Sequence, residues 1–167
     1  TRPAPQRSPG FFGGNAMNYR IAVCDDSDAD RNYVSDLVRR WAYITGHEVD
    51  LRAFSSAESF LFDFSEDEAY DMLLLDIEMG GIDGVTMAKR VRAVSESMQI
   101  IFITGYSDYI AEGYDVAALH YLMKPVDEGK LFSVLDRAAE QLSKNEKTIS
   151  LETSDGIDRV PVYKIRY

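Results

Sequence analysis

Two short segments of the chain are apolar almost from end to end, and they restrict the fold more than any other feature. They occupy residues 71–76, DMLLLD, and residues 99–104, QIIFIT. A strand with one face in solvent alternates apolar and polar residues, whereas a continuous apolar run indicates burial on both faces. Strands buried on both faces are typical of parallel sheets covered by helices, so the two segments predict an α/β fold.

Strand patterns and helix patterns alternate along the rest of the chain. Apolar or alternating segments predict five strands, at residues 19–24, 48–54, 71–76, 99–104 and 119–123. Each is followed by a segment with apolar residues at helical spacing, at residues 28–46, 55–64, 84–95, 108–117 and 127–144. Five strand–helix repeats predict a parallel sheet with helices on both faces.

Capping residues mark the starts of two of these helices. Asp28 or Asp30 is expected to cap the first helix. For the second helix, Ser55 or Ser56 is the expected N-cap, and Glu58 has the spacing of a capping box with Ser55.

Polar residues follow the predicted strands at one edge of the sheet. The first strand ends in Asp25 and Asp26, and the third ends in Asp76. The fourth ends in Thr104, and Lys124 follows the fifth. Because ligands of open α/β sheets bind beyond the carboxyl ends of the strands, we expect these five side chains to gather there. Each of them alone is equally consistent with a capping, turn or surface residue.

Three carboxylates at one edge repel each other unless a cation lies between them. At a separation of about 5 Å and an effective dielectric constant of about 20, each pair costs roughly 3 kcal/mol. Mg²⁺ is the expected cation, because it is bound by a few carboxylates and coordinates phosphate oxygens. A carboxylate can also attack phosphorus as a nucleophile. The pattern therefore predicts that Asp76 accepts a phosphoryl group whose oxygens contact Lys124 and Thr104.

Four motifs in this order resemble the receiver domain of a two-component response regulator. They are VCDDSDADR, MLLLDIEMGGIDG, IIFITGYSDYI and ALHYLMKPVD, and the resemblance extends over residues 19–144. It implies a flavodoxin-like, doubly wound sheet of five parallel strands in the order 2-1-3-4-5. It also implies that Asp25 and Asp26 bind Mg²⁺ and that Asp76 accepts its phosphoryl group from a sensor histidine kinase.

The same resemblance assigns roles to the residues around the acceptor. Glu78 would bind the metal through its backbone carbonyl. Thr104 would be the switch hydroxyl, Lys124 the phosphate-binding lysine and Tyr121 the aromatic switch. The peptide bond between Lys124 and Pro125 would be cis.

Phosphorylation is expected to draw Thr104 inward together with Tyr121. The altered surface of the fourth helix and fifth strand would then form a homodimer. Gly80 stands where the family has proline, which predicts a more flexible loop after the acceptor. Tyr106, Tyr109 and Tyr114 form an aromatic cluster near the predicted fourth helix. The cluster could serve internal packing or form a surface for a partner.

The resemblance divides the chain into three parts. Residues 1–16, rich in Pro and Gly, are expected to be a leader added for expression or a disordered arm, with a native extension as the alternative. Residues 17–145 would form the receiver domain. Residues 146–167 would be a linker and the truncated start of a LytTR-type DNA-binding output domain, because residues 148–167 alternate around Asp155 and Gly156 like a hairpin. A native C-terminal hairpin is the alternative.

Composition limits the classes of partner. The net charge of −10 disfavours binding to nucleic acid, so DNA would be bound only through the output domain. No apolar run approaches the roughly 20 residues that span a bilayer, and no secretory signal is visible. Cys24, the single cysteine, cannot form an internal disulfide and is expected to be a core residue. We therefore predict a cytoplasmic protein that does not bind membranes.

Two other functions compete with the phosphorylation switch. A Mg²⁺-dependent haloacid-type phosphatase would also use an aspartyl nucleophile, but that class has a second Asp two residues later, where this chain has Glu78. A flavin-binding module would need a loop of Ser, Thr and Gly after the first strand, where DDSDADR is acidic. On the leading prediction the protein is not an enzyme, because it would assist only its own phosphotransfer and dephosphorylation.

Overall fold

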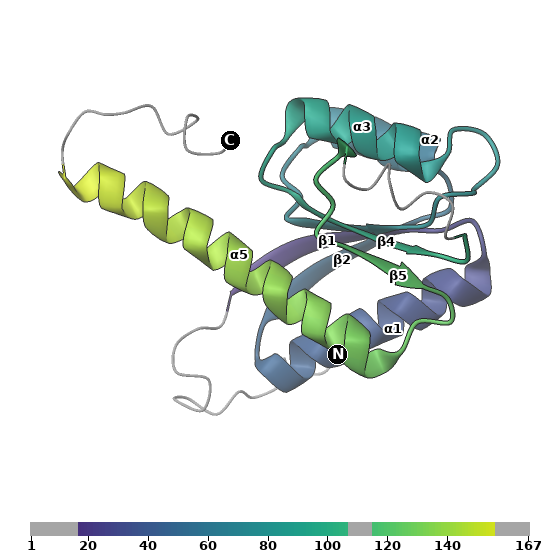
Figure 1. Ribbon diagram of the computed structural model, residues 1–167, viewed down its shortest axis with the longest axis horizontal. Coiled ribbons are helices and arrows are strands. Elements are labelled where there is room, and N and C mark those ends of the chain that lie inside the picture. Colours follow the sequence, from purple (N-terminus) through teal and green to yellow (C-terminus); the bar gives the residue numbers. More distant parts are fainter. Residues whose placement is uncertain (1–16, 107–114, 156–167) are drawn as a thin grey trace.

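The structure, a computed structural model, describes the backbone of residues 17–106 and 115–155 and the side chains of residues 17–106 and 115–146. Within the described residues, each strand except β4 is followed by a helix, as the sequence pattern predicts (Figure 1). The strands are β1 (Asn18–Cys24), β2 (Glu48–Phe54), β3 (Met72–Leu75), β4 (Gln99–Thr104) and β5 (His120–Met123). The helices are α1 (Asp28–Thr45), α2 (Ala57–Glu66), α3 (Gly84–Val94) and α5 (Glu128–Asp155).

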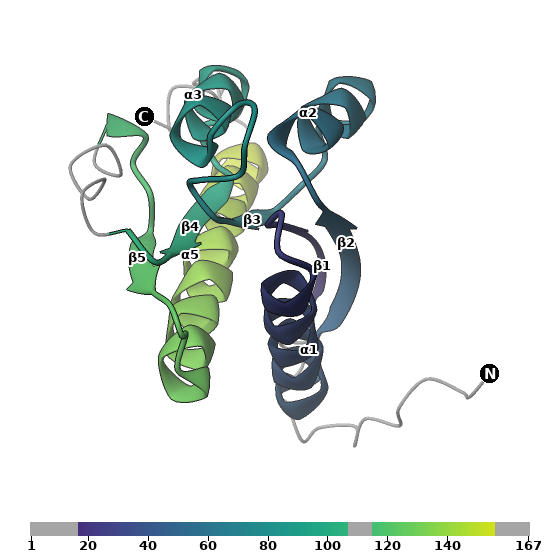
Figure 2. The same cartoon turned by 90° about the vertical axis from the view of Figure 1, so that its right-hand side faces the viewer.

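All strand pairs are parallel, and the order in the sheet is β2-β1-β3-β4-β5. The expected flavodoxin-like order is thus confirmed. Helices α1 and α5 cover one face of the sheet, and α2 and α3 cover the other (Figures 1 and 2). Such a doubly wound sheet leaves the carboxyl ends of its strands free to build a site.

Continuous apolar strands make two cores, one on each face of the sheet. Successive side chains of a strand point to opposite faces. In β3, Leu74 packs among residues of α1 and α5, whereas Leu73 and Leu75 pack among residues of α2 and α3. All four residues of β3 and all six of β4 are buried. Cys24 belongs to the second core, and burial raises the pKa of its thiol to about 12, so it is a neutral core residue as expected.

The caps of α1 and α2 differ in part from the sequence predictions. Ser27 caps α1, and its hydroxyl accepts a hydrogen bond from the backbone N–H of Asp30, so the prediction of Asp28 or Asp30 was wrong. Both acids are instead in the first turn, where carboxylates favour the positive end of the helix dipole. Ser56 caps α2, as one of the two predicted alternatives.

Helix α5 runs through residue 155, and the prediction of a strand at residues 148–155 was therefore wrong. Extending an existing helix adds one hydrogen bond per residue, whereas an isolated hairpin is only marginally stable. The rest of the expected hairpin, the leader at residues 1–16 and residues 108–114 of the expected fourth helix lie outside the described residues. Among the described helices, none is long and apolar enough to cross a membrane.

The serine that caps α2 can be identified by substitution. Ser56 Oγ accepts a hydrogen bond of 3.0 Å from Ser59 N, so Ser56→Ala should lower the free energy of unfolding by about 1 kcal/mol. Ser55→Ala is the matched control and should have little effect. Urea denaturation followed by circular dichroism measures both, and an equal loss in the Ser55 variant would contradict this assignment.

Candidate functional site

Strand register brings Asp25 and Asp76 together. Cys24 pairs with Leu75 across β1 and β3, so each acid is the first residue beyond its strand. The backbone N–H of Asp76 donates to the Cys24 carbonyl at 3.0 Å, which fixes the two strand ends side by side. Both side chains are almost fully buried, with 4% of Asp25 and 6% of Asp76 exposed. The sheet therefore holds two carboxylates rigidly at its edge.

Asp26 completes a group of three acids. One carboxylate oxygen from each of Asp25, Asp26 and Asp76 lies within 4.8 Å of the others. Two of the three are buried and Asp26 is exposed, so the group opens to solvent on one side. Hard carboxylate oxygens with room for water are the donor set that suits Mg²⁺. The residues present therefore fit the ion that the sequence pattern predicts.

Lys124 follows β5, the outer strand of the sheet on the side away from β2, and its side chain reaches the acids. Its backbone N–H donates to the Thr104 carbonyl at 2.9 Å, which ties the end of β5 to the end of β4. Its Nζ lies 2.8 Å from Asp76 Oδ2 and 2.9 Å from Asp25 Oδ2. The peptide bond between Lys124 and Pro125 is cis, as the resemblance implied.

A further acid, Asp30, belongs to the site and was missed by the sequence analysis as a site residue. Its Oδ2 lies 2.7 Å from Lys124 Nζ. The available signal was its position in the first turn of α1, because a helix that starts directly after β1 places its first turn at the same edge as Asp25 and Asp26.

The site carries more negative than positive charge. Three carboxylates, those of Asp25, Asp30 and Asp76, contact the Lys124 ammonium, and the Asp26 carboxylate lies close to two of them. Burial raises the pKa of Asp25, although hydrogen bonds from Lys124 and Ser27 oppose this effect. Burial also acts to lower the pKa of Lys124, but hydrogen bonds to its three carboxylate partners outweigh it and raise that pKa. A divalent cation would offset the remaining excess of negative charge.

Thr104 and Tyr121 meet through the backbone of Tyr106. The fully buried Thr104 hydroxyl accepts a hydrogen bond of 3.4 Å from Tyr106 N, and the Tyr121 hydroxyl donates to the Tyr106 carbonyl. The Tyr121 ring also packs against Phe102, with 5.8 Å between ring centroids. The two predicted switch residues thus share one backbone neighbour, a contact that no local sequence pattern encodes.

Comparison with known proteins identifies the family. A family model described as the response regulator receiver domain matches residues 21–136, more than half of the chain. The chain belongs to this family. The solved structures most like it include the response regulatory domain of MrkE from Klebsiella pneumoniae, with a TM-score of 0.68 and 19% identity over 75% of this chain and 98% of that one. A BeF3-activated DrrB receiver domain has a TM-score of 0.64 and 25% identity over 74% and 99%.

Curated relatives include both longer and shorter proteins. The sensory transduction protein LytT of Bacillus subtilis is 31% identical over 118 residues, which are 71% of this chain and 47% of that protein. The sporulation initiation phosphotransferase F of the same species is 29% identical over 66% of this chain and 86% of that protein. The chain thus spans about half the length of the LytT relatives that it matches. These matches do not support the alternative of a haloacid-type phosphatase.

The loop after Asp76 departs from the usual pattern of receiver domains and is held by α2. Gly80 has a φ of 72°, which the ring of a proline excludes. The backbone N–H of Ile82 donates to Glu58 Oε2 at 3.0 Å, so the capping box predicted for Glu58 was wrong. This carboxylate instead connects α2 to the loop. Glu78 is exposed, and a role for its backbone carbonyl in metal binding stays a prediction.

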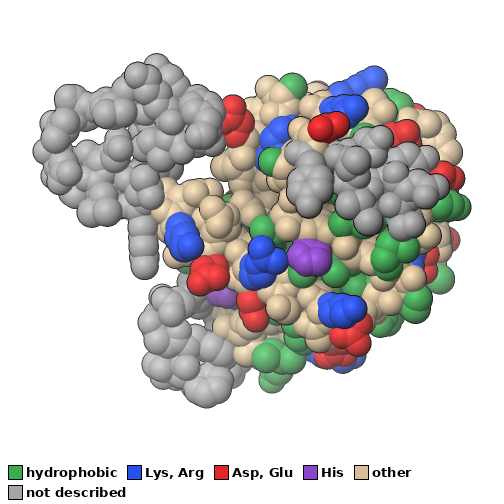
Figure 3. All heavy atoms as spheres, in the orientation of Figure 1, with side chains coloured by type: hydrophobic (Ala, Val, Ile, Leu, Met, Phe, Trp, Pro, Cys, Tyr) green, Lys and Arg blue, Asp and Glu red, His purple; other side chains and the backbone are tan. Residues whose placement is uncertain are grey.

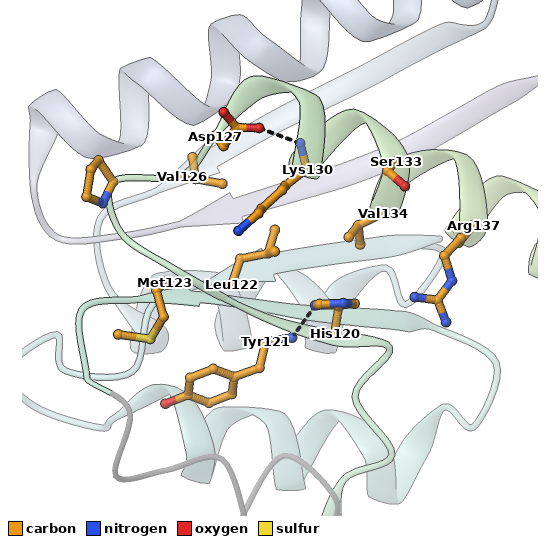
Figure 4. Close-up of a pocket in the computed structure, with 11 residues that line it drawn as sticks. His120, Tyr121, Leu122, Met123, Val126, Asp127, Lys130, Ser133, Val134 and Arg137 are labelled. Atoms are coloured by element: carbon orange, nitrogen blue, oxygen red, sulfur yellow. Dashed lines mark hydrogen bonds between the residues drawn. The ribbon is translucent and has the colours of Figure 1, made fainter.

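The receiver domain has a separate hollow of about 380 Å³ between β5 and α5. Figure 4 shows Lys130 and Val134 of α5 facing Leu122 of β5 across it, with Arg137 further along the helix. Tyr121 projects from the opposite side of the strand, as alternation along β5 requires (Figure 4). Basic, acidic and apolar side chains are interspersed over this face (Figure 3). The hollow does not include the acid cluster.

Gly84 allows α3 to begin directly against the acceptor. A Cβ at this position would lie 2.0 Å from the backbone oxygen of Asp76, so Gly84→Ala should lower the free energy of unfolding by about 1–3 kcal/mol or more. Gly105→Ala is the matched control, because a Cβ there would meet nothing within 4 Å. Thermal and urea unfolding compare the two variants, and a Gly84 variant as stable as the Gly105 variant would contradict this close approach.

Proposed function

We propose that this receiver domain accepts a phosphoryl group on Asp76 from a sensor histidine kinase in the cytoplasm. The observation that carries the proposal is the position of Asp76. Its buried carboxylate ends β3 beside the acids Asp25 and Asp26 and within 2.8 Å of the Lys124 ammonium. An acceptor carboxylate needs such rigid placement, because a small displacement from the reacting phosphorus costs much of the rate.

The transfer moves a phosphoryl group from nitrogen to oxygen. A carboxylate oxygen of Asp76 forms a bond to phosphorus while the bond from phosphorus to a histidine nitrogen breaks. The leaving imidazole keeps the electron pair of that bond. Lys124 can donate to a phosphoryl oxygen once one of its present contacts is released, since its ammonium lies beside Asp76.

Mg²⁺ would be held by Asp25, Asp26 and Asp76, with the backbone carbonyl of Glu78 as a further ligand. When bound, it would reduce the repulsion between the acceptor carboxylate and the incoming phosphoryl group. Asp76 itself stays oriented by the Ile77 backbone N–H, which donates to Asp76 Oδ1 at 2.6 Å.

The phosphoryl group would change the surface of the domain through Thr104 and Tyr121. Thr104 would donate its hydroxyl proton to a phosphoryl oxygen and weaken its contact with Tyr106 N. Because the Tyr121 hydroxyl is bound to the carbonyl of the same Tyr106, the two side chains are expected to shift together. This is a population shift that a local change of charge biases.

The readout would be a homodimer formed through the fourth helix and β5, which controls a LytTR-type DNA-binding output domain. The match covers only about half of the LytT relatives, and this supports the existence of an output domain beyond the receiver. The net charge of −10 agrees with DNA binding by that other domain. On this proposal the receiver catalyses only its own phosphotransfer and dephosphorylation.

Phosphorylation can be tested with a small donor. Acetyl phosphate and Mg²⁺ should add one phosphoryl group to the wild type, detected by intact mass spectrometry or reductive trapping, and excess EDTA should prevent it. Asp76→Asn should stay unmodified, because an amide is not a nucleophile towards phosphorus. Asp71→Asn is the matched control, since Asp71 precedes the opposite end of β3. Labelling of the Asp76 variant at the wild-type level would refute the assignment of the acceptor.

Dimerisation can be tested with beryllofluoride as a stable mimic of the phosphoryl group. Sedimentation velocity should show a monomer without it and a dimer with it and Mg²⁺. His120→Glu adds a negative charge to the exposed edge of β5 and should weaken the dimer several-fold without preventing phosphorylation. Tyr43→Glu, on the exposed end of α1, should dimerise like the wild type. A His120 variant that dimerises normally would exclude β5 from the interface.

A further inference from the structure

Three carboxylates already occupy the Lys124 ammonium where a phosphoryl group would bind. The ammonium donates to Asp30 at 2.7 Å and to Asp76 at 2.8 Å, and it forms an ion pair with Asp25 at 2.9 Å. For Lys124 to bind a phosphoryl oxygen, at least one of these contacts must break. The identity of that contact decides how readily the site accepts an anion.

Asp30 differs from the other two partners of Lys124. Asp25 and Asp76 belong to the cluster that suits a cation, so their oxygens have a second role. Within the described residues, the Asp30 carboxylate has Lys124 as its one hydrogen-bond partner. It is also far more exposed, at 45% of its side chain against 6% for Asp25 and 8% for Asp76. Water can therefore replace the ammonium at Asp30 more easily than at the buried acids.

We propose that Asp30 is a positioning residue that holds the Lys124 ammonium towards α1 until an anion binds at Asp76. This inference rests on the proposed function. The Asp30 carboxylate competes with the incoming phosphoryl oxygens for the same N–H donor. Removal of the Asp30 carboxylate should free the Lys124 ammonium and take one negative charge away from the site. Both effects favour binding of an anion.

The charge effect needs a control in the same helix turn. Asp28 lies two residues earlier, in the same first turn of α1, but its carboxylate pairs with Arg31 and not with Lys124. Asp28→Asn and Asp30→Asn remove the same charge near the same helix end. The comparison cancels the shared loss of charge and leaves the difference between a partner of Lys124 and a partner of Arg31, which donates only to the backbone carbonyl of Asp25 in the site.

Isothermal titration with beryllofluoride at saturating Mg²⁺ measures the affinity for the anion. Asp30→Asn should bind about two- to fivefold more tightly than Asp28→Asn, the range for a half-exposed ion pair. Asp30→Glu, which keeps the carboxylate, should return towards the wild type. Affinity for Mg²⁺ alone should be the same in the two Asn variants, whereas general damage to the site would weaken both ligands in the Asp30 variant.

The same variants give a second readout with acetyl phosphate. The half-saturating concentration of the donor should fall in Asp30→Asn, while the maximal labelling rate should change less. Asp30→Ser is a second neutral variant if the Asn protein does not fold. Equal or weaker beryllofluoride binding by the neutral Asp30 variants, compared with Asp28→Asn, would overturn the inference. A wild type that binds no beryllofluoride would instead count against the proposed function itself.

Discussion

The contact between one ammonium and three carboxylates is the interaction on which the rest of this site depends. Asp25 and Asp76 are nearly buried, and an unpaired buried charge is costly. Lys124 compensates them from β5, which lies at the far edge of the sheet from β2. The order of the strands, the register of β1 with β3 and the close approach of Gly84 all serve to place these groups. The fold therefore holds a small cluster of carboxylates and one ammonium at fixed positions.

Much of this arrangement could be predicted, because most of the site residues stand directly after the predicted strands. The strands 48–54 and 99–104 were predicted with the bounds that the structure has. Asp25, Asp26, Asp76 and Lys124 meet, as expected, because parallel strands present their carboxyl ends at one edge. The positions of β3 and β4 inside the sheet could also be predicted, since neither strand has a polar face that could be exposed to solvent.

The errors concern contacts that local patterns do not encode. Ser27 rather than an aspartate caps α1, and the nearby carboxylate of Asp30 instead reaches Lys124, 94 residues further along the chain. Glu58 had the spacing of a local capping box, yet it binds the loop at Ile82. In both cases a donor far away in the sequence, the Lys124 ammonium or the Ile82 backbone N–H, replaced the local backbone N–H that capping would use. The alternation at residues 148–155 suited a strand, but the helix that precedes it continued.

Because α5 is long, a small change in its direction near Lys124 would displace its far end by several times more. The helix begins at Glu128, four residues after Lys124, and continues to Asp155, past the edge of the sheet (Figure 1). At 1.5 Å per residue its 28 residues form a rod about 42 Å long, so a tilt of about 5° at its start displaces its far end by about 4 Å. A small rotation of α5 near the acid cluster would therefore become a much larger displacement at residue 155.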